Sequence, residues 1–333
     1  MTRTFGAVAL ALAVAACTTQ VGSTAAQATQ SGTAGTAQRS DWDRSYGGAD
    51  KSDDTALPQL RKLIAPKFQT LTFADAVTGK TMTYSLFVPS DYDPGRGYPL
   101  VLFIADANTT GKGAEAPLKQ GYGGIIWATP ESQAKHASFV LVPAFAGRGF
   151  VVNDQWEVSD EVGTALRLLD AVVSRYSIDK YRLYATGQSM GGMISFYLNA
   201  THPDLFAASL FVGSQWDVTV LNPLAKKKFF YIVSAADPKA SKGMRELADM
   251  LTNKGVAFGT TTFSARLPQH EQEKAIEALL GQGFDINFVQ FTAGTTGRPK
   301  GALLTHRGMV ATTREWVGVV GLRPGDRYPI VNP

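Results

Sequence analysis

The chain has little of several residue types that mark particular protein classes. Cysteine occurs once, at position 17, and histidine four times among 333 residues, so no intrachain disulfide can form and no cluster of metal ligands is visible. The formal net charge is only +4, and no block of five basic residues occurs, which excludes the usual footprint of a nucleic-acid-binding protein. The hydrophobic fraction of 44% is ordinary for a globular protein.

The first residues have the pattern of an export signal. Arg3 supplies a positive charge, and the apolar run Phe5–Ala16 is too short to span a membrane. Small residues precede Cys17, which resembles a bacterial lipoprotein signal with its lipobox. That resemblance implies a signal peptide of residues 1–16, lipidation of Cys17 and, with Thr18 next, a lipid anchor in the cell envelope, at the outer membrane. An ordinary secretory peptide that contains a cysteine is the alternative.

The remaining chain divides by composition. Residues 17–55 are rich in Ser, Thr, Ala, Gln and Gly, which predicts a flexible tether because such a segment buries little apolar surface. Residues 56–291 alternate apolar runs with segments of helical spacing, which predicts a mostly parallel sheet covered by helices on both faces. The expected strands are 68–73, 82–88, 100–104, 139–143, 181–186, 207–212, 229–234, 258–263 and 287–291, and the expected helices are 159–175, 193–199, 244–251 and 271–280.

One motif in this domain carries chemistry. Ser189 lies at the centre of Gly187-Gln188-Ser189-Met190-Gly191, between an apolar strand and a helix-forming run. Flanking glycines allow the sharp, strained turn that exposes a nucleophilic serine at the carboxyl ends of the strands. The context predicts an α/β-hydrolase fold with Ser189 as nucleophile, and a tight structural turn is the alternative.

The partners of Ser189 are sought along the chain in the order serine, acid, histidine. Asp237 directly follows the strand 229–234 and is predicted to orient the histidine, with helix capping as the alternative role. The oxyanion hole is expected from the N–H of Met190 and an N–H near Ala107, in the loop after Ile104.

Two tryptophans are candidates for the substrate site. Trp156 and Trp216 each stand beside polar residues, so both are candidates for lining the pocket, with core packing as the alternative.

Several segments resemble the polyhydroxybutyrate depolymerase/feruloyl esterase-like family of secreted α/β hydrolases, over about residues 68–295. The segments are Ala134–Pro143, Tyr184–Met193, Pro203–Ala208, Gln215–Asp217 and Ala236–Ala240. The resemblance implies hydrolysis of small or polymeric carboxylic esters without a cofactor, with Ser189 as nucleophile and Asp237 as acid. The chain departs from the family in the oxyanion loop, where it has Ala105-Asp106-Ala107.

The catalytic base is the open question. His136 and His202 are expected to be structural, and His270 opens a helix after the strand 258–263. The resemblance implies a base in the loop after the strand 287–291, but the family's motif is absent there. His306 is the only histidine after that strand, so chain order favours it; His270, or no competent base, remain the alternatives.

The end of the chain resembles a different family. Phe291–Gly301 looks like the phosphate-binding signature of acyl-CoA synthetases, and Leu304–Gly308 and Gly321–Arg327 continue that resemblance, over about residues 288–333. The adenylation fold needs several hundred residues around this loop, so no working synthetase site is expected. Residues 292–333 are therefore interpreted as a synthetase-like fragment that is not an independent domain, joined near Phe291–Thr295.

Three functions follow from these observations. The first is a serine hydrolase that cleaves carboxylic esters through an acyl-enzyme at Ser189, impaired by loss of the histidine segment. The second is a catalytically inactive hydrolase-fold lipoprotein that acts as a binding module. The third is a truncated adenylate-forming fragment that binds nucleotide.

Overall fold

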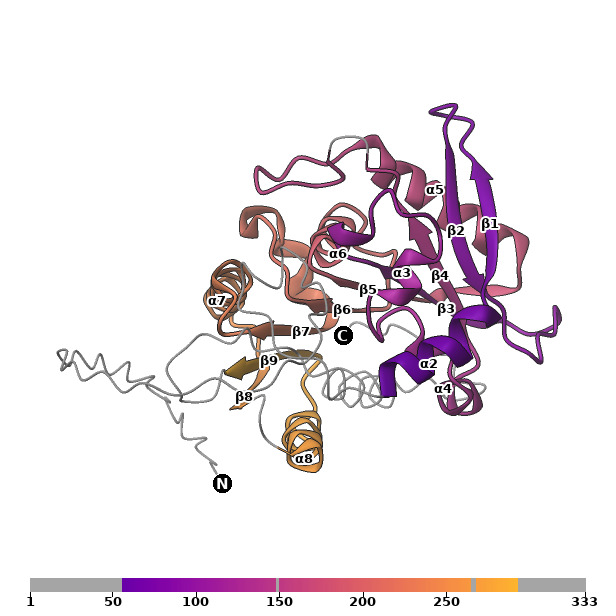
Figure 1. Cartoon of the computed structure of the whole chain (residues 1–333). Coiled ribbons are helices and arrows are strands. Elements are labelled where there is room, and N and C mark those ends of the chain that lie inside the picture. The colour runs from indigo at the N-terminus through magenta and orange to yellow at the C-terminus, as the bar shows by residue number, and fades with distance from the viewer. Residues whose placement is uncertain (1–55, 148–149, 265–267, 293–333) are drawn as a thin grey trace, which may run out of the picture. The chain divides into compact units, whose positions relative to one another are not determined.

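The computed structural model describes residues 56–147, 150–264 and 268–292. The predicted tether, Cys17 and His306 therefore lie outside the described residues. At the centre is a nine-stranded sheet in the order β1-β2-β4-β3-β5-β6-β7-β9-β8 (Figure 1). Its strands are β1 (Gln69–Ala74), β2 (Thr81–Phe87), β3 (Tyr98–Ile104), β4 (Phe139–Ala144), β5 (Ile178–Gln188), β6 (Ala208–Val212), β7 (Lys228–Ser234), β8 (Gly259–Ser264) and β9 (Ile286–Thr292).

Strand direction follows from how the strands are connected. β1 and β2 form an antiparallel hairpin, whose turn places Gly79 at φ +68°, and β2 also pairs antiparallel with β4. All the other pairings are parallel. β3 is buried at every position, as its unbroken apolar run predicts for a parallel strand that is covered on both faces.

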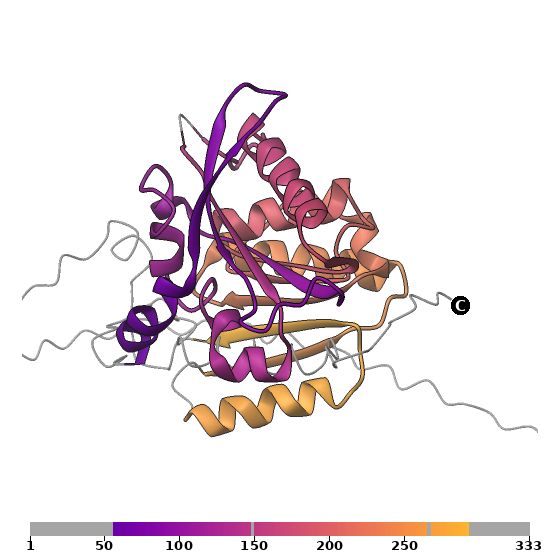
Figure 2. The same ribbon diagram turned by 90° about the vertical axis from the view of Figure 1, so that its right-hand side faces the viewer.

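Helices cover both faces of the sheet (Figures 1 and 2). α5, α6 and α7 pack on one face, whereas α2 and α8 contribute to the apolar cluster on the other. The helices are α2 (Ala56–Ile64), α3 (Ala116–Lys119), α4 (Pro130–Lys135), α5 (Asp160–Arg175), α6 (Met190–Thr201), α7 (Pro238–Asn253) and α8 (Gln269–Leu280). Within the described ranges, no helix is both long enough and apolar enough to cross a bilayer.

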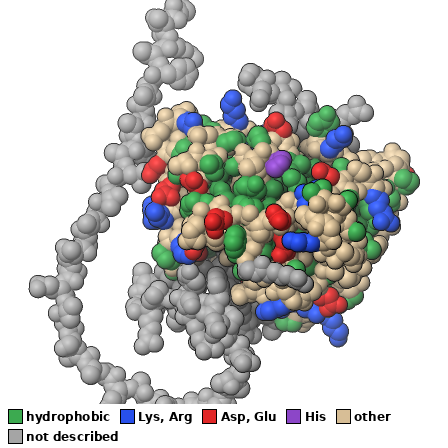
Figure 3. All heavy atoms as spheres, turned by 90° about the horizontal axis from the view of Figure 1, so that it is seen from above, with side chains coloured by type: hydrophobic (Ala, Val, Ile, Leu, Met, Phe, Trp, Pro, Cys, Tyr) green, Lys and Arg blue, Asp and Glu red, His purple; other side chains and the backbone are tan. Residues whose placement is uncertain are grey.

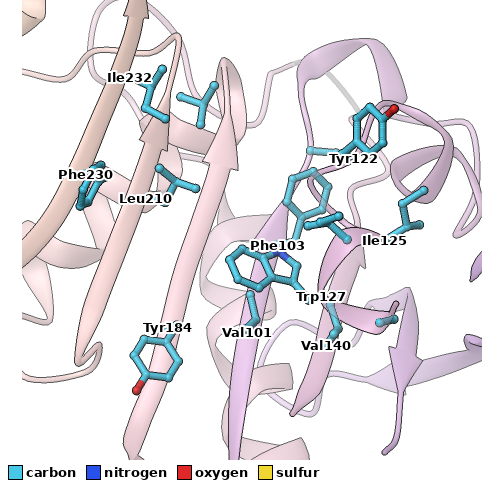
Figure 4. Packing of buried hydrophobic residues seen from close by; sticks show 14 of the residues in the cluster. Val101, Phe103, Tyr122, Ile125, Trp127, Val140, Tyr184, Leu210, Phe230 and Ile232 are labelled. Atoms are coloured by element: carbon cyan, nitrogen blue, oxygen red, sulfur yellow. The ribbon is translucent and has the colours of Figure 1, made fainter. Parts of the chain in front are cut away.

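The core lies in two layers, one on each face of the sheet. On the face of α2 and α8, side chains from β3, β5, β6 and β7 meet the segment after α3, and Phe103 lies against Trp127 (Figure 4). On the opposite face, Phe196 of α6 stacks on Phe211 of β6, with ring centroids 3.8 Å apart. Burial of such large rings is the main stabilising contribution to the sheet that carries the site.

The predicted secondary structure is confirmed in type for every expected strand and helix, with differences at the boundaries. The helix after the serine motif begins at Met190 rather than at Met193, and α7 begins at Pro238 rather than at Met244. Ser159 occupies the predicted N-cap of α5, but its hydroxyl makes no capping bond. The predicted sheet, mostly parallel and covered on both faces, is therefore present.

Candidate active site

Ser189 occupies a sharp turn between β5 and α6. It has φ +53° and ψ −119°, whereas almost all non-glycine residues have negative φ. Its N–H donates to the carbonyl of Val212 at the end of β6 (2.9 Å), and its carbonyl accepts from the N–H of Met193 (3.0 Å). Both bonds hold the residue in a conformation of high energy, which is typical of functional sites. The geometry is that of the predicted strand-to-helix elbow.

The glycines around Ser189 are needed for close backbone packing. A Cβ on Gly187 would lie 2.2 Å from the carbonyl oxygen of Gly191, and a Cβ on Gly191 would lie 1.9 Å from that of Ile104. A Cβ on Gly192 would lie 2.1 Å from the Oγ of Ser214. No side chain fits at these positions, so the elbow depends on three glycines, of which the motif itself contains two.

The predicted oxyanion donors lie on segments that touch at this elbow. Met190 is the first residue of α6, where backbone N–H groups have no acceptor within the helix and the helix dipole is positive. The packing of Gly191 against Ile104 brings the loop after β3, with the exposed Ala107, beside it. The hydroxyl of Thr110 in that loop lies 4.0 Å from the sulfur of Met190.

The unusual Asp106 of this loop has a structural role. Its Oδ1 accepts from the N–H of Asn108 (2.9 Å), and its Oδ2 accepts from Nε2 of Gln120 (2.7 Å). Gln120 also accepts from the N–H of Asp106 (2.9 Å). These bonds hold the loop before Ala107 rigid, which suits a backbone donor that has to be in place before charge develops.

Asp237 follows β7 and caps α7. Its Oδ1 accepts from the N–H groups of Lys239 (3.0 Å) and Ala240 (2.9 Å). The capping alternative is therefore present in the structure. It does not exclude the catalytic role, because Oδ2 makes none of these capping bonds. Asp237 and Ser189 stand at the same edge of the sheet, two strands apart, or about 10 Å by strand spacing. In the predicted arrangement of serine, histidine and acid, an imidazole ring lies between the two side chains.

Two of the described histidines lie at the edge of the sheet opposite to the edge that carries Ser189. His136 follows α4 and precedes β4, and His202 follows α6 and precedes β6, so both lie at the amino ends of parallel strands. Ser189 lies at the carboxyl ends. Burial, with a smaller contribution from the charge of Lys135, lowers the pKa of His136 below its ordinary value. Neither ring is placed to activate Ser189.

His270 is placed at the edge of the sheet and on its other face. It lies at the start of α8, which packs on β8, the edge strand and four strands from β5. Four strand spacings are about 19 Å. Figures 1 and 2 show α8 on the face opposite α6 and α7. The ring is 66% exposed, and its Nε2 lies 3.1 Å from Glu271. The structure does not bring His270 and Ser189 together.

The end of β9 lies beside the acid. β9 pairs with β7 so that Phe291 is opposite Ser234, and the N–H of Ala235 donates to the carbonyl of Phe291 (2.7 Å). The chain therefore leaves the sheet next to the loop of Asp237, where the resemblance implied the base. His306 itself lies outside the described residues.

One buried residue that stabilises the surroundings of the site, Tyr231, is not indicated by any sequence motif. Tyr231 of β7 is fully buried, and its hydroxyl bonds to the carbonyl of Ser214 and lies 3.1 Å from that of Ala240. It thereby connects the turn after β6 with the start of α7. Among the described residues, no group of three His, Cys, Asp or Glu side chains is arranged to hold a metal ion.

Trp156 and Trp216 lie against one another, with ring centroids 5.4 Å apart. Trp216 is buried (4% exposed), whereas Trp156 is 37% exposed. One of the two candidates therefore belongs to the core, and the other reaches the surface.

Comparison with family models finds two matches. Residues 75–244 match the family described as "Putative esterase", and residues 214–333 match the family described as "AMP-binding enzyme". The second match begins well before residue 288, where the synthetase resemblance was placed. The two matches overlap over residues 214–244, which contain β7, and β8 and β9, which lie only in the second match, are hydrogen-bonded into the same sheet.

Comparison with solved structures supports the fold. A thermostable esterase aligns with a TM-score of 0.59 and 23% identity, covering 77% of this chain and 64% of that one. A ferulic acid esterase from the anaerobic fungus Anaeromyces mucronatus aligns with a TM-score of 0.49 and 11% identity, covering 76% and 91%. With the sheet order, the first of these confirms the predicted α/β-hydrolase fold.

Curated relatives match only a short segment. The 3-[(3aS,4S,7aS)-7a-methyl-1,5-dioxo-octahydro-1H-inden-4-yl]propanoyl:CoA ligase of Mycobacterium tuberculosis is 39% identical over 49 residues, which cover 15% of this chain and 10% of the ligase. The chain thus spans about two thirds of the thermostable esterase and a tenth of the ligase.

Proposed function

The chain belongs to the family of putative esterases, whose model matches about half of it, and on that premise we propose that it hydrolyses carboxylic esters through an acyl-enzyme at Ser189. The observation that carries the proposal is the positive φ of Ser189 at the junction of β5 and α6. A backbone held in this conformation presents the hydroxyl above the carboxyl ends of the strands.

The reaction has two halves. The Oγ of Ser189 attacks the ester carbonyl carbon while a histidine takes its proton, and the N–H groups of Met190 and Ala107 donate to the oxyanion. The histidine then protonates the alcohol as the carbon–oxygen bond breaks. Water hydrolyses the acyl-enzyme by the same steps. Asp237 orients the imidazole and stabilises its charge. No cofactor enters, and the substrate is a small or polymeric ester.

His306 is the base in this proposal. Among the described residues, no histidine lies at the carboxyl ends of β5, β7 or β9, and His306 follows β9 along the chain. Because its segment resembles a synthetase rather than a hydrolase, we expect turnover to be slow.

A fluorophosphonate probe tests the nucleophile directly. We expect the full chain to be labelled at one site, and labelling to be lost in Ser189→Ala. His306→Gln is expected to slow labelling by about 10²-fold or more, the usual contribution of a general base, whereas His270→Gln is the matched control and leaves the rate unchanged. Absence of labelling in the unaltered chain refutes the proposal. An equal loss in both histidine variants refutes the assignment of His306.

The two other functions predict different results. An inactive hydrolase-fold lipoprotein that acts as a binding module is not labelled, although it binds esters. An adenylate-forming fragment is stabilised against thermal unfolding by ATP, and the match of residues 214–333 to AMP-binding enzymes is the observation in its favour. Thermal unfolding with and without ATP therefore belongs beside the labelling experiment.

Anchoring to the envelope is the second part of the proposed function. Residues 1–16 direct export, Cys17 carries the lipid, and residues 17–55 hold the domain away from the outer membrane. In a bacterial host, the chain is expected to partition into the detergent phase of a Triton X-114 extract, and Cys17→Ser is expected to move it to the aqueous phase. Aqueous partition of the unaltered chain contradicts lipidation.

The synthetase-like end is explained by a junction near Phe291–Thr295, where the esterase and synthetase resemblances meet. Sequencing the source DNA across codons 285–300 tests this, with a recombination or assembly boundary as the expected result. Continuous sequence without such a boundary contradicts it.

A further inference from the structure

Among the described residues, only two that are not glycine have positive φ. One is Ser189 at +53°, and the other is Trp156 at +66°. For a bulky side chain this backbone conformation is unfavourable, and glycine or asparagine adopts it at lower cost. Strain of this kind persists only where surrounding interactions impose it, and it is concentrated at functional sites.

The loop of Trp156 imposes this conformation through its own hydrogen bonds. Val152 and Val158 form an antiparallel bridge that closes the loop. Within it, the side chain of Asn153 accepts from the N–H of Glu157 (3.0 Å), and its carbonyl accepts from the N–H of Trp156 (3.1 Å). The backbone that carries the indole is therefore held by bonds within the loop.

The same loop is fastened to the edge of the sheet that carries Ser189 and Asp237. Asp154 forms an ion pair with Lys239, whose N–H bonds to Asp237, and accepts from the side chain of Gln215 (3.4 Å). Gln215 follows β6, the strand between those of Ser189 and Asp237. Trp156 is thus placed by residues that flank the acid.

The ring of Trp156 contacts a buried ring, and the residue is partly exposed. It packs edge to face on the buried Trp216 (61° between planes), which packs in turn on Tyr197 of α6 (5.8 Å). Its loop lies in the upper part of Figure 1, on the side of the molecule that Figure 3 views from above. Hydrophobic side chains gather in the middle of that face (Figure 3). Phe150, 43% exposed, belongs to the same segment.

We propose that Trp156 is a specificity-determining residue whose exposed indole binds an aromatic ring of the ester. The inference rests on the proposed function of Ser189. A ring is favoured over a polyol because the acid and the amide before Trp156 are bonded to other side chains: Asp154 to Lys239, and Asn153 to Glu157. Aromatic faces and edges attract one another beyond the burial of their area, and the Trp216 support leaves the ring pre-positioned for such a contact.

Binding to the full chain with Ser189→Ala tests the inference without turnover. Ethyl benzoate carries a ring on the acyl side and benzyl acetate on the alcohol side, and ethyl hexanoate has none. Dissociation constants are measured by ligand-observed NMR titration of the Ser189→Ala chain and of two chains that carry a further substitution. Trp156→Asn removes the ring and introduces a residue that tolerates positive φ. Trp156→Phe keeps a ring. Tyr181→Asn is the control, since Tyr181 is 75% exposed on β5, toward the amino end of that strand.

We expect Trp156→Asn to raise the dissociation constant of at least one ring ester about fivefold. The dissociation constant of ethyl hexanoate is expected to change less than twofold. The ester that is affected shows whether the ring belongs to the acyl or the alcohol half. Trp156→Phe is expected to stay within twofold of the parent, and Tyr181→Asn to change nothing. No binding of either ring ester, or an equal loss for all three esters, overturns the inference.

The two proposals fail separately. If the probe does not label Ser189 but the ring esters still depend on Trp156, the ester hydrolase proposal is refuted and the binding role stands. If Ser189 is labelled and Trp156→Asn leaves ring-ester binding unchanged, only the role of Trp156 is refuted.

Discussion

Replacing Gly192 by alanine disturbs the elbow at a point where the structure fixes the size of the conflict. The added Cβ lies 2.1 Å from the Oγ and 2.6 Å from the Cβ of Ser214. Ser214 is only 1% exposed, so its side chain has no room to swing aside. Overpacking of this kind costs about 1–3 kcal/mol. The strain also pushes α6 from the turn after β6, which displaces the N–H of Met190 and slows labelling of Ser189.

A second substitution makes the prediction specific to this contact. Ser214→Gly removes the two nearest atoms that the new Cβ meets and leaves the carbonyl oxygen of Gly187, at 3.1 Å. The Oγ of Ser214 has no hydrogen-bond partner among the described residues, so its loss leaves no group unpaired. We expect Ser214→Gly alone to cost about 1 kcal/mol. The double variant is expected to be at least about 1 kcal/mol more stable than the sum of the single effects.

Urea-induced unfolding measures the free energies, and the rate of fluorophosphonate labelling measures the site. Partial recovery of both in the double variant is the expected result. Simple additivity of the two free energies, or a Gly192→Ala chain as stable as the parent, shows that α6 does not press on Ser214 and refutes the reasoning.

Three further changes follow from contacts elsewhere in the domain. In Gly191→Ala the new Cβ meets only backbone atoms, of Ile104 and Ala105, so we expect the free energy of unfolding to fall by more than about 3 kcal/mol and labelling to slow about 10²-fold. Gly79→Ala is the control: its Cβ enters open space, and we expect a loss of about 1–2 kcal/mol with normal labelling. Tyr231→Phe removes a buried hydroxyl that bonds to the carbonyls of Ser214 and Ala240, and is expected to lower the free energy of unfolding by about 1–2 kcal/mol, seen as a lower urea midpoint with an unchanged m value. Hydrogen bonds, above all those from Arg167, hold the pKa of Asp75 well below its ordinary value. The ionised carboxylate therefore stabilises the fold fully above its unfolded pKa of about 3.9, and this contribution is lost as the pH falls below that value. Urea unfolding between pH 6 and pH 2 should show the free energy of unfolding decreasing, and Asp75→Asn should flatten that decrease.

The elements of the sheet were predictable because each carries its signal locally. β3 is an unbroken apolar run with Pro99 within it, and every residue of it is buried, as a strand between two helix layers requires. The elbow was predictable from the two glycines of the motif around Ser189, Gly187 and Gly191, whereas the need for Gly192 appears only in the structure. The start of α6 was predicted three residues late, because Gly191 and Gly192 have poor helix propensity. Tertiary packing overrides that propensity: the two glycines permit contacts that side chains would forbid.

The parts that sequence did not predict depend on residues far apart in the chain. The ion pair of Asp154 with Lys239 joins positions 85 residues apart, and that of Asp75 with Arg167 joins positions 92 residues apart. The positive φ of Trp156 is likewise a consequence of how its loop is bonded and anchored, and tryptophan itself gives no signal of such a conformation. No periodicity or motif in the sequence predicts these contacts, although the ion pair of Asp154 with Lys239 positions the loop of Trp156.

The chain between β9 and His306 is long enough for the proposed base to approach Ser189. β9 is three strands from β5, so a residue that follows Thr292 has to cross about 14 Å to approach Ser189. His306 is 14 positions after Thr292, and 14 residues of extended chain span about 46 Å. His270 lacks this freedom, because α8 is packed on the edge strand by its buried Ile276 and Leu279. On the proposed assignment of His306, activity at the Ser189 elbow depends on how well the segment after Thr292 holds that imidazole, because β5 and β7 already bring Ser189 and Asp237 to the same edge of the sheet.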